Sequence, residues 1–245
     1  MTSFTQDGFL DSRILVRQPT DGFRSGLDAV LLAASIPAEE NDELLELGSG
    51  SGAASLCAAH RISKTKVIGL EIDARLVDLA NENARANKLD DRVSFMGVDV
   101  FSLPQEIKRD FDHVFSNPPF HGENGEIPPD ASRARALHDE GRLRDWLELG
   151  VKRTASHGTF TCIIRADRMN EALSALPERG LAMFPVWPRA DTPAKRVILQ
   201  LRKASRAPLA VLPGLVLHAA GGRYTDEAEA VLRGGASLAL ASPRL

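Results

Sequence analysis

The chain has 245 residues, of which 43% are hydrophobic and 26% charged, and its formal net charge of −3 excludes a general electrostatic attraction to nucleic acid. This composition is ordinary for a globular protein, and the length favours one large α/β domain. No apolar run reaches the roughly 18 residues that cross a bilayer. Residues 1–7 lack the basic and apolar regions of an export signal, so we expect a cytoplasmic protein without a membrane segment. The two cysteines, Cys57 and Cys162, lie in apolar stretches, which predicts buried thiols and no disulfide framework.

The first two predicted elements are short. Residues 8–18 alternate weakly between apolar and polar side chains and predict a strand or a hairpin. Residues 25–36 (SGLDAVLLAASI) are apolar at helical spacing, with Ser25 as the expected N-cap and Pro37 directly after the last residue. We therefore expect a helix in this segment.

From residue 43 onward, strand and helix patterns alternate. The predicted strands cover residues 43–47, 66–70, 93–98, 112–116 and 158–164, and the predicted helices cover residues 53–60, 73–87, 103–108 and 143–154, with Asp73 as an N-cap. After about residue 185 come two consecutive strands, residues 196–201 and 209–217, and a short helix, residues 226–232. This order predicts a Rossmann-like α/β fold, with a mostly parallel seven-stranded sheet, an antiparallel edge and helices on both faces.

A glycine-rich turn follows the first of these strands. Its glycines are Gly48, Gly50 and Gly52, and an acid, Glu46, precedes them. Glycines at such a turn let the backbone approach a ligand and point the amides of a helix N-terminus at it. The G-x-G-x-G spacing differs from the G-x-G-x-x-G of dinucleotide enzymes, and the carboxylate of Glu46 suits a cationic sulfonium better than a pyrophosphate. Taken alone, the turn leaves an ordinary strand-to-helix connection as the alternative.

Two more carboxylates stand at the ends of the next strands. Glu71 ends the second strand, about 20 residues after the turn, where an acid can accept hydrogen bonds from both ribose hydroxyls. The alternative for Glu71, a helix cap, is weak because Asp73 already fills that position. Asp99 follows the third strand and can accept from the amino group of an adenine. Open α/β sheets bind ligands at the carboxyl ends of their strands, so the three signals together predict a nucleoside cofactor site.

The fourth strand runs into Asn117-Pro118-Pro119-Phe120. Two prolines make a rigid turn and leave the carbonyl of Pro118 outside any strand ladder. The amide oxygen of Asn117 and this carbonyl can then accept both hydrogens of one planar NH₂, which localises the nitrogen lone pair for attack on a methyl sulfonium without a strong base. Phe120 offers a face on which an extruded base can stack. A plain Pro-Pro turn is the alternative.

This order of motifs resembles the amino-group branch of class I methyltransferases, and more specifically the bacterial tRNA1(Val) adenine-N6 methyltransferases. Residues 18–32 (QPTDGFRSGLDAVLL) are similar to that family's N-terminal block, which lies over the cofactor, and the tail around Arg189, residues 195–197 and residues 224–225 is similar as well. The resemblance implies S-adenosyl-L-methionine as the cofactor and tRNA as the substrate, with the adenine on the 3′ side of the anticodon as the target. Many members have Tyr in place of Phe120; a Phe keeps the stacking face and loses a hydroxyl.

Two other targets stay open. Asn-Pro-Pro-Phe followed by His121-Gly122 is also similar to the rRNA guanine-N2 methyltransferases, and His121 is a candidate for the target pocket. Protein glutamine-N5 methyltransferases have the same Asn-Pro-Pro-aromatic site, but they usually carry an N-terminal helical domain, whereas about 40 residues precede the first strand here. The histidines show no HExxH or paired-ligand spacing, so we expect no metal site.

We expect one methyltransferase domain over residues 1–245. Within it, residues 1–40 form a cap over the cofactor, residues 41–165 the cofactor-binding core, and residues 166–245 the sheet edge with an RNA-contact region. Because the net charge is negative, an RNA surface must be local. The densest positive segment contains Arg189, Lys195, Arg196, Arg202, Lys203 and Arg206. Lys195 and Arg196 are the predicted RNA contacts, and the solvated edge of a hairpin is the alternative.

Overall fold

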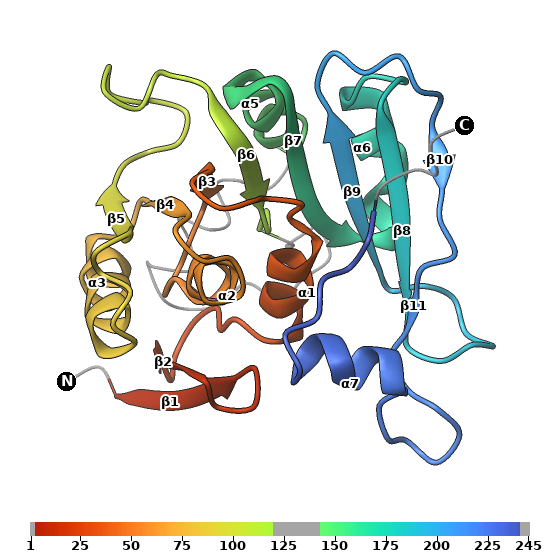
Figure 1. The fold of residues 1–245 in the computed structure, drawn as a ribbon, viewed down its shortest axis with the longest axis horizontal. Coiled ribbons are helices and arrows are strands. Elements are labelled where there is room, and N and C mark those ends of the chain that lie inside the picture. The colour runs from red at the N-terminus through yellow and green to blue at the C-terminus, as the bar shows by residue number, and fades with distance from the viewer. Residues whose placement is uncertain (1–2, 120–142, 241–245) are drawn as a thin grey trace.

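The computed structural model describes residues 3–119 and 143–240 (Figure 1). Its strands are β1 (Phe4–Phe9), β2 (Ile14–Pro19), β3 (Glu43–Leu47), β4 (Lys66–Glu71), β5 (Val93–Gly97), β6 (Phe111–Ser116), β7 (Thr154–Arg165), β8 (Leu181–Trp187), β9 (Arg196–Arg202), β10 (Ala210–Val211) and β11 (Leu215–Val216). Its helices are α1 (Leu27–Ser35), α2 (Ala53–Arg61), α3 (Ala74–Ala86), α5 (Leu143–Arg153), α6 (Met169–Ala175) and α7 (Asp226–Leu232), with a 3₁₀ turn η1 (Ala166–Arg168) before α6. None of the described helices is long and apolar enough to cross a membrane.

The central sheet is mostly parallel, as predicted. In the described part of the chain it has nine strands in the order β10-β8-β9-β7-β6-β3-β4-β5, with β11 also paired with β8. Strands β3 to β7 are parallel, and β9 runs antiparallel to both β7 and β8. The antiparallel strand β9 is therefore not at the outer edge of the sheet, because β8, which was not predicted from the sequence, pairs on its other side and β10 and β11 pair with β8.

The predicted strand at residues 209–217 is two short strands. β10 and β11 pair with β8 at Ala182–Met183 and at Val186–Trp187, and the residues between them make no ladder. Pro185 of β8 lies at this gap and has no N–H to donate, so a continuous neighbour could not be fully paired there. The proline in β8 also explains why its sequence gives a weak strand signal.

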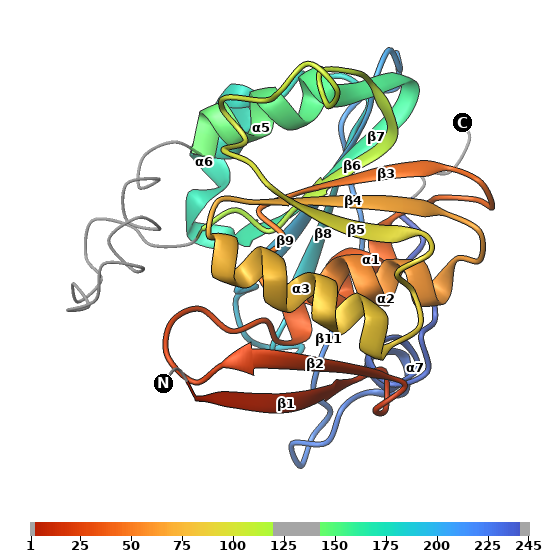
Figure 2. The ribbon, with the colours of Figure 1, turned by 90° about the vertical axis from the view of Figure 1, so that its left-hand side faces the viewer.

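Hydrophobic side chains cover both faces of the sheet. Because neighbouring residues in a strand point to opposite faces, Leu44 of β3 packs in the core with α1, α2, α3 and α7, whereas Leu45 packs in the core with α5 and α6. Figure 2 shows these two helical layers on either side of the sheet. The helix α5 comes close to β7 at Gly150, where a Cβ atom would lie 2.1 Å from the ring of Phe160.

Two local predictions were wrong. Residues 103–108 form turns and no helix; the amides of Ile107 and Lys108 donate to the carbonyl of Pro104, which closes a single turn. Ser25 is not an N-cap, because Gly26 occupies that position at the start of α1. Both backbone groups of Ser25 are instead held by the side chain of Gln18.

The N-terminal hairpin of β1 and β2 docks on α3, outside the main sheet (Figure 2). Asn83 and Asn87 lie one helical turn apart on α3, and their side chains bond the backbone of β2 in the way that a neighbouring strand would. The carboxamide of Asn83 bonds the N–H and the carbonyl of Arg17 at 2.9 and 3.0 Å, and that of Asn87 bonds those of Leu15 at 2.9 and 2.7 Å. This docking determines where the chain leaves β2 and crosses to α1.

Candidate functional site

The turn from Gly48 to Gly52, here called the glycine turn, joins β3 to α2 and is tied to β4. The amides of Gly48 and Ser49 both donate to the carbonyl of Leu70 at 2.9 Å. Gly48, Gly50 and Gly52 have φ values of +72°, +54° and +87°, a region that disfavours other residues. A Cβ atom at Gly48 or Gly52 would collide with Trp146 or Phe95, whereas one at Gly50 would meet nothing within 4 Å. The backbone at Gly50 is therefore open to the close approach of a ligand.

Glu71 stands at the end of β4 and reaches back to this turn. One carboxylate oxygen accepts from the amide of Gly50 at 2.9 Å, and the other accepts from the amides of Ile72 and Asp73 at 2.8 and 3.0 Å. Burial raises the pKa of Glu71, and the three amide bonds oppose that rise. As predicted, Asp73 caps α3, with its side chain accepting from the amide of Arg75 at 2.9 Å. Glu71 is thus free of a capping role and adjoins the open backbone of Gly50.

Glu46 lies beneath the glycine turn and is only 3% exposed. Its carboxylate accepts from the amide of Ser55 at 3.1 Å and from the hydroxyl of Ser55 at 2.5 Å, in the first turn of α2. Burial raises the pKa of Glu46 to about 8, even though the bonds from Ser55 oppose the rise. The described contacts of Glu46 therefore anchor the turn against the helix that follows it.

Asp99 lies just beyond β5, on the same edge of the sheet. Gly97 pairs with Glu71, and the amide of Val98 donates to the carbonyl of Glu71 at 2.9 Å, so Asp99 follows close to the end of β4. Its side chain is exposed and accepts from the amide of Phe101 at 2.9 Å. The strand order β6-β3-β4-β5 places Asn117, the glycine turn, Glu71 and Asp99 in a row.

Asn117 comes beside the glycine turn because Ser116 of β6 pairs with Leu47 of β3. The oxygen Oδ1 of Asn117 is buried and has no hydrogen-bond partner among the described residues. Leaving a buried acceptor unpaired costs about 1–3 kcal/mol, so this oxygen is suited to accept from a donor that a ligand brings. Pro118 is buried and Pro119 half-buried beside it. Phe120, His121 and the other expected features of this loop lie outside the described residues.

The predicted basic segment is split between opposite edges of the sheet. Arg196 pairs with Arg165 at the carboxyl end of β7, so Lys195 and Arg196 lie on the edge that carries the glycine turn. Arg202 ends β9 at the other edge. Arg196 also pairs with Asp28 in the first turn of α1, at 2.9 Å between Nε and Oδ2. Lys195 and Arg196 are therefore the end of the basic segment that lies on the same edge as the glycine turn.

A cluster of hydrogen-bonded polar residues next to the site, centred on Gln18, was not predicted from the sequence. This side chain is 1% exposed and bonds Ser51 inside the glycine turn at 3.2 Å. The available signal was a polar residue in an inward position, since Gln18 follows Ile14 and Val16 at strand spacing and both are buried. Across the described ranges, no three His, Cys, Asp or Glu side chains gather closely enough to hold a metal ion.

Comparisons with known proteins show which family this chain is similar to. A family model described as Methyltransferase small domain matches residues 25–143. A protein of Serratia proteamaculans (strain 568) named tRNA1(Val) (adenine(37)-N6)-methyltransferase is 28% identical over 226 residues, which cover 90% of this chain and 86% of that protein. A protein of the same name from Bacteroides fragilis (strain YCH46) is 30% identical over 180 residues, which cover 71% of this chain and 75% of that protein.

Solved structures share the fold. A predicted O-methyltransferase, protein Atu636 from Agrobacterium tumefaciens, matches with a TM-score of 0.72 at 24% identity, over 86% of this chain and 98% of that chain. A precorrin-6y C5,15-methyltransferase from Geobacter metallireducens GS-15 matches with a TM-score of 0.55 at 13% identity, over 76% and 93% of the two chains. Together with the relatives above, these matches identify the fold as that of a class I methyltransferase. The chain belongs to the tRNA1(Val) (adenine(37)-N6)-methyltransferase family.

Proposed function

We propose that this protein is a cytoplasmic enzyme that transfers the methyl group of S-adenosyl-L-methionine to N6 of an adenine in tRNA, on the 3′ side of the anticodon. The observation that carries the proposal is Asn117, whose buried amide oxygen lacks a partner among the described residues and adjoins the glycine turn. An unpaired acceptor at this place suits a planar NH₂ group, which has two hydrogens to donate.

The residues along the carboxyl edge of the sheet suit the cofactor. S-adenosyl-L-methionine, when bound, supplies a methyl group on a cationic sulfonium. Glu71 would accept from the ribose hydroxyls, Asp99 would accept from the adenine amino group, and the open backbone at Gly50 would allow close approach. Glu46 would act from below the turn: burial favours its neutral form, and the positive charge of a bound sulfonium would favour the carboxylate instead. We propose the same division of the chain as above, with residues 1–40 as cap, 41–165 as cofactor-binding core and 166–245 as RNA-contact region.

Asn117 and Pro118 would act on the target amine. The oxygen Oδ1 of Asn117 and the carbonyl of Pro118 each accept one hydrogen of the NH₂ group, which withdraws the nitrogen lone pair from the aromatic ring. The nitrogen would then be able to take the methyl group as the sulfur–carbon bond breaks, and its extra proton would leave to water. Positioning and electrostatics supply the catalysis, and Pro119 keeps the turn rigid.

A methyl-transfer assay tests this function directly. The protein is incubated with tritiated S-adenosyl-L-methionine and total tRNA or rRNA from a strain that lacks the gene, and the labelled nucleoside is identified. We expect N6-methyladenosine in tRNA, located by nuclease mapping next to the anticodon. Labelled N2-methylguanosine in rRNA, or label in protein, would contradict the proposed target.

For the RNA surface, we predict that Lys195 and Arg196 contact phosphates. Lys195→Ala combined with Arg196→Ala should weaken tRNA binding and reduce the slope of log K against log salt by about 0.7 to 0.9 per lost phosphate contact. Base preference should hardly change, because phosphate contacts carry no sequence information. Binding is measured at several salt concentrations.

The same strand offers a matched control for this prediction. Arg202→Ala combined with Arg206→Ala also removes two positive charges, but at the far end of β9. We expect the salt slope of this control to stay close to the wild-type value. Equal slopes for both double variants would place the RNA surface elsewhere, with Arg133 and Arg135 as the next candidates.

A further inference from the structure

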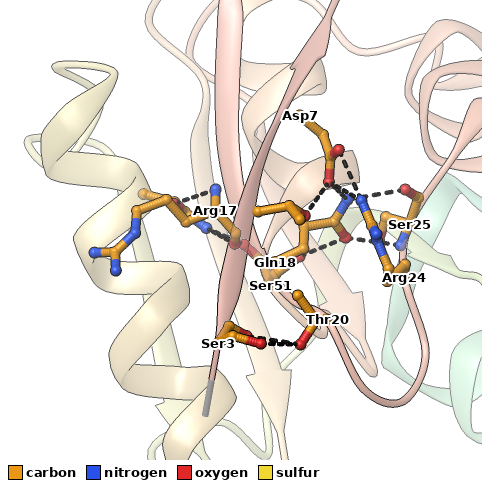
Figure 3. Close-up of polar contacts among 10 residues, drawn as sticks. Ser3, Asp7, Arg17, Gln18, Thr20, Arg24, Ser25 and Ser51 are labelled. Atoms are coloured by element: carbon orange, nitrogen blue, oxygen red, sulfur yellow. Dashed lines mark hydrogen bonds and ion pairs between the residues drawn. The ribbon is translucent and has the colours of Figure 1, made fainter. Parts of the chain in front are cut away.

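Gln18 is a buried polar side chain whose carboxamide uses all of its hydrogen-bonding capacity. Nε2 donates to Oδ2 of Asp7 at 2.8 Å and to the carbonyl of Ser25 at 3.0 Å. Oε1 accepts from the amide of Ser25 at 2.8 Å and from the hydroxyl of Ser51 at 3.2 Å. Figure 3 shows Gln18 between these partners, which come from β1, from the loop before α1 and from the glycine turn.

The partners dictate which way the carboxamide points. Asp7 and the carbonyl of Ser25 can only accept, so they must face Nε2, and the amide of Ser25 can only donate, so it must face Oε1. Arg24 holds Asp7 in place, with Nη2 at 2.8 Å from both carboxylate oxygens. Burial alone would raise the pKa of Asp7, but the bonds from Arg24 and Gln18 outweigh it and hold the pKa below its ordinary value. Asp7 is therefore a charged acceptor that keeps Oε1 of Gln18 turned toward Ser51.

Ser51 lies in the glycine turn, directly after Gly50. Its hydroxyl is held by Gln18, and its carbonyl accepts from Nδ2 of Asn83 at 3.0 Å. On the other side, the amide of Gly50 donates to Glu71. Gly50, where the turn is open, and the buried Ser51 are thus held from opposite sides, by the N-terminal hairpin and α3 on one side and by the end of β4 on the other.

We propose that Gln18, oriented by Asp7 and Arg24, is a positioning residue that holds the glycine turn in the shape that receives the cofactor. The proposal rests on the proposed function, because it takes the turn as the cofactor site. Gln18 acts through Ser51 and needs no contact with the cofactor itself. Removing its bonds leaves the chemistry of methyl transfer intact. The turn then has to become ordered when the cofactor binds, and the entropy lost in this ordering weakens cofactor binding.

Gln18→Glu and Ser51→Ala test this role. Glutamate keeps an oxygen for the hydroxyl of Ser51, but it cannot donate to Asp7 and brings a second carboxylate beside it. We expect the Kd for S-adenosyl-L-homocysteine, measured by calorimetry, to rise about 10-fold in Gln18→Glu and about threefold in Ser51→Ala. The KM for S-adenosyl-L-methionine should rise in parallel, while kcat at saturating cofactor stays within about twofold of the wild-type value.

Asn87→Ala is the matched control. It removes two carboxamide bonds to the same hairpin, at Leu15, but touches no residue of the glycine turn. We expect Asn87→Ala to lower the melting temperature and to leave the Kd unchanged. An unchanged Kd in Gln18→Glu and Ser51→Ala, or an equal rise in Asn87→Ala, would overturn the positioning role.

If Gln18→Glu does not fold, Ser51→Ala against Asn87→Ala decides the question, because Ser51→Ala removes a single hydroxyl. If the wild-type protein itself does not bind S-adenosyl-L-homocysteine, the proposed function fails, and the positioning role fails with it.

Discussion

Asn117→Ala should lower kcat by about 100- to 1000-fold, the usual effect of removing one preorganised hydrogen-bonding group from a transition state. The oxygen Oδ1 of Asn117 is buried beside the glycine turn without a partner among the described residues, which suits a bond that forms when a donor arrives. In the proposed reaction that donor is the target NH₂, whose lone pair becomes available during the transfer. Single-turnover kinetics with saturating cofactor and tRNA measure the effect.

The affinity for S-adenosyl-L-homocysteine in this variant should stay within about twofold of the wild-type value, because Asn117 acts on the target amine and not on the sulfonium. Asn117→Asp is the control, since it keeps an acceptor at the same place and should retain more turnover than Asn117→Ala. If Asn117→Ala lost cofactor affinity while the bound enzyme kept its rate, Asn117 would have to be assigned to the cofactor.

Glu71→Ala should weaken cofactor binding by about 1.5–3 kcal/mol, or about 10- to 150-fold in Kd. The substitution removes the charged acceptor proposed for the ribose hydroxyls. It also removes the acceptor for the amide of Gly50, so the open part of the glycine turn loses one of its two supports. Calorimetry with S-adenosyl-L-homocysteine measures the loss.

Two variants separate the acceptor role of Glu71 from a loss of folding. Glu71→Gln keeps one oxygen and replaces the other with an NH₂ group, which faces backbone amides that also donate. We therefore expect its cofactor affinity to lie between those of the wild type and Glu71→Ala. Asp73→Ala removes the cap of α3 two residues away and should lower stability more than affinity. A Glu71→Ala protein that binds as tightly as the wild type would place the ribose elsewhere.

The sequence by itself determined the type of fold and the order of the site. Strand periodicity, turn glycines and the Asp73 cap are local signals, and the structure has the predicted strands β3 to β7 and helices α1, α2, α3, α5 and α7 within a few residues. Parallel strands end at one edge of a sheet, so Glu71, Asp99 and Asn117 could be placed together before any contact was known. Elements without a local signal could not be predicted in this way, and β8 with its internal Pro185 is an example.

Only the tertiary structure decided which distant segments meet. The cations of the basic segment are divided between the two ends of β9, with Lys195 and Arg196 at one end and Arg202 and Lys203 at the other, because an extended strand of seven residues carries its ends to opposite edges of the sheet. In contrast, Gln18 and Ser51 are far apart in sequence and come into contact because Asn83 of α3 bonds both Arg17 of the hairpin and the carbonyl of Ser51. Each of these side chains has many possible hydrogen-bond partners in an unfolded chain. In the folded protein only a few partners lie within reach, and a buried polar side chain has to bond one of them because leaving it unpaired costs free energy. That selection depends on the packing of the whole molecule, which no local pattern contains.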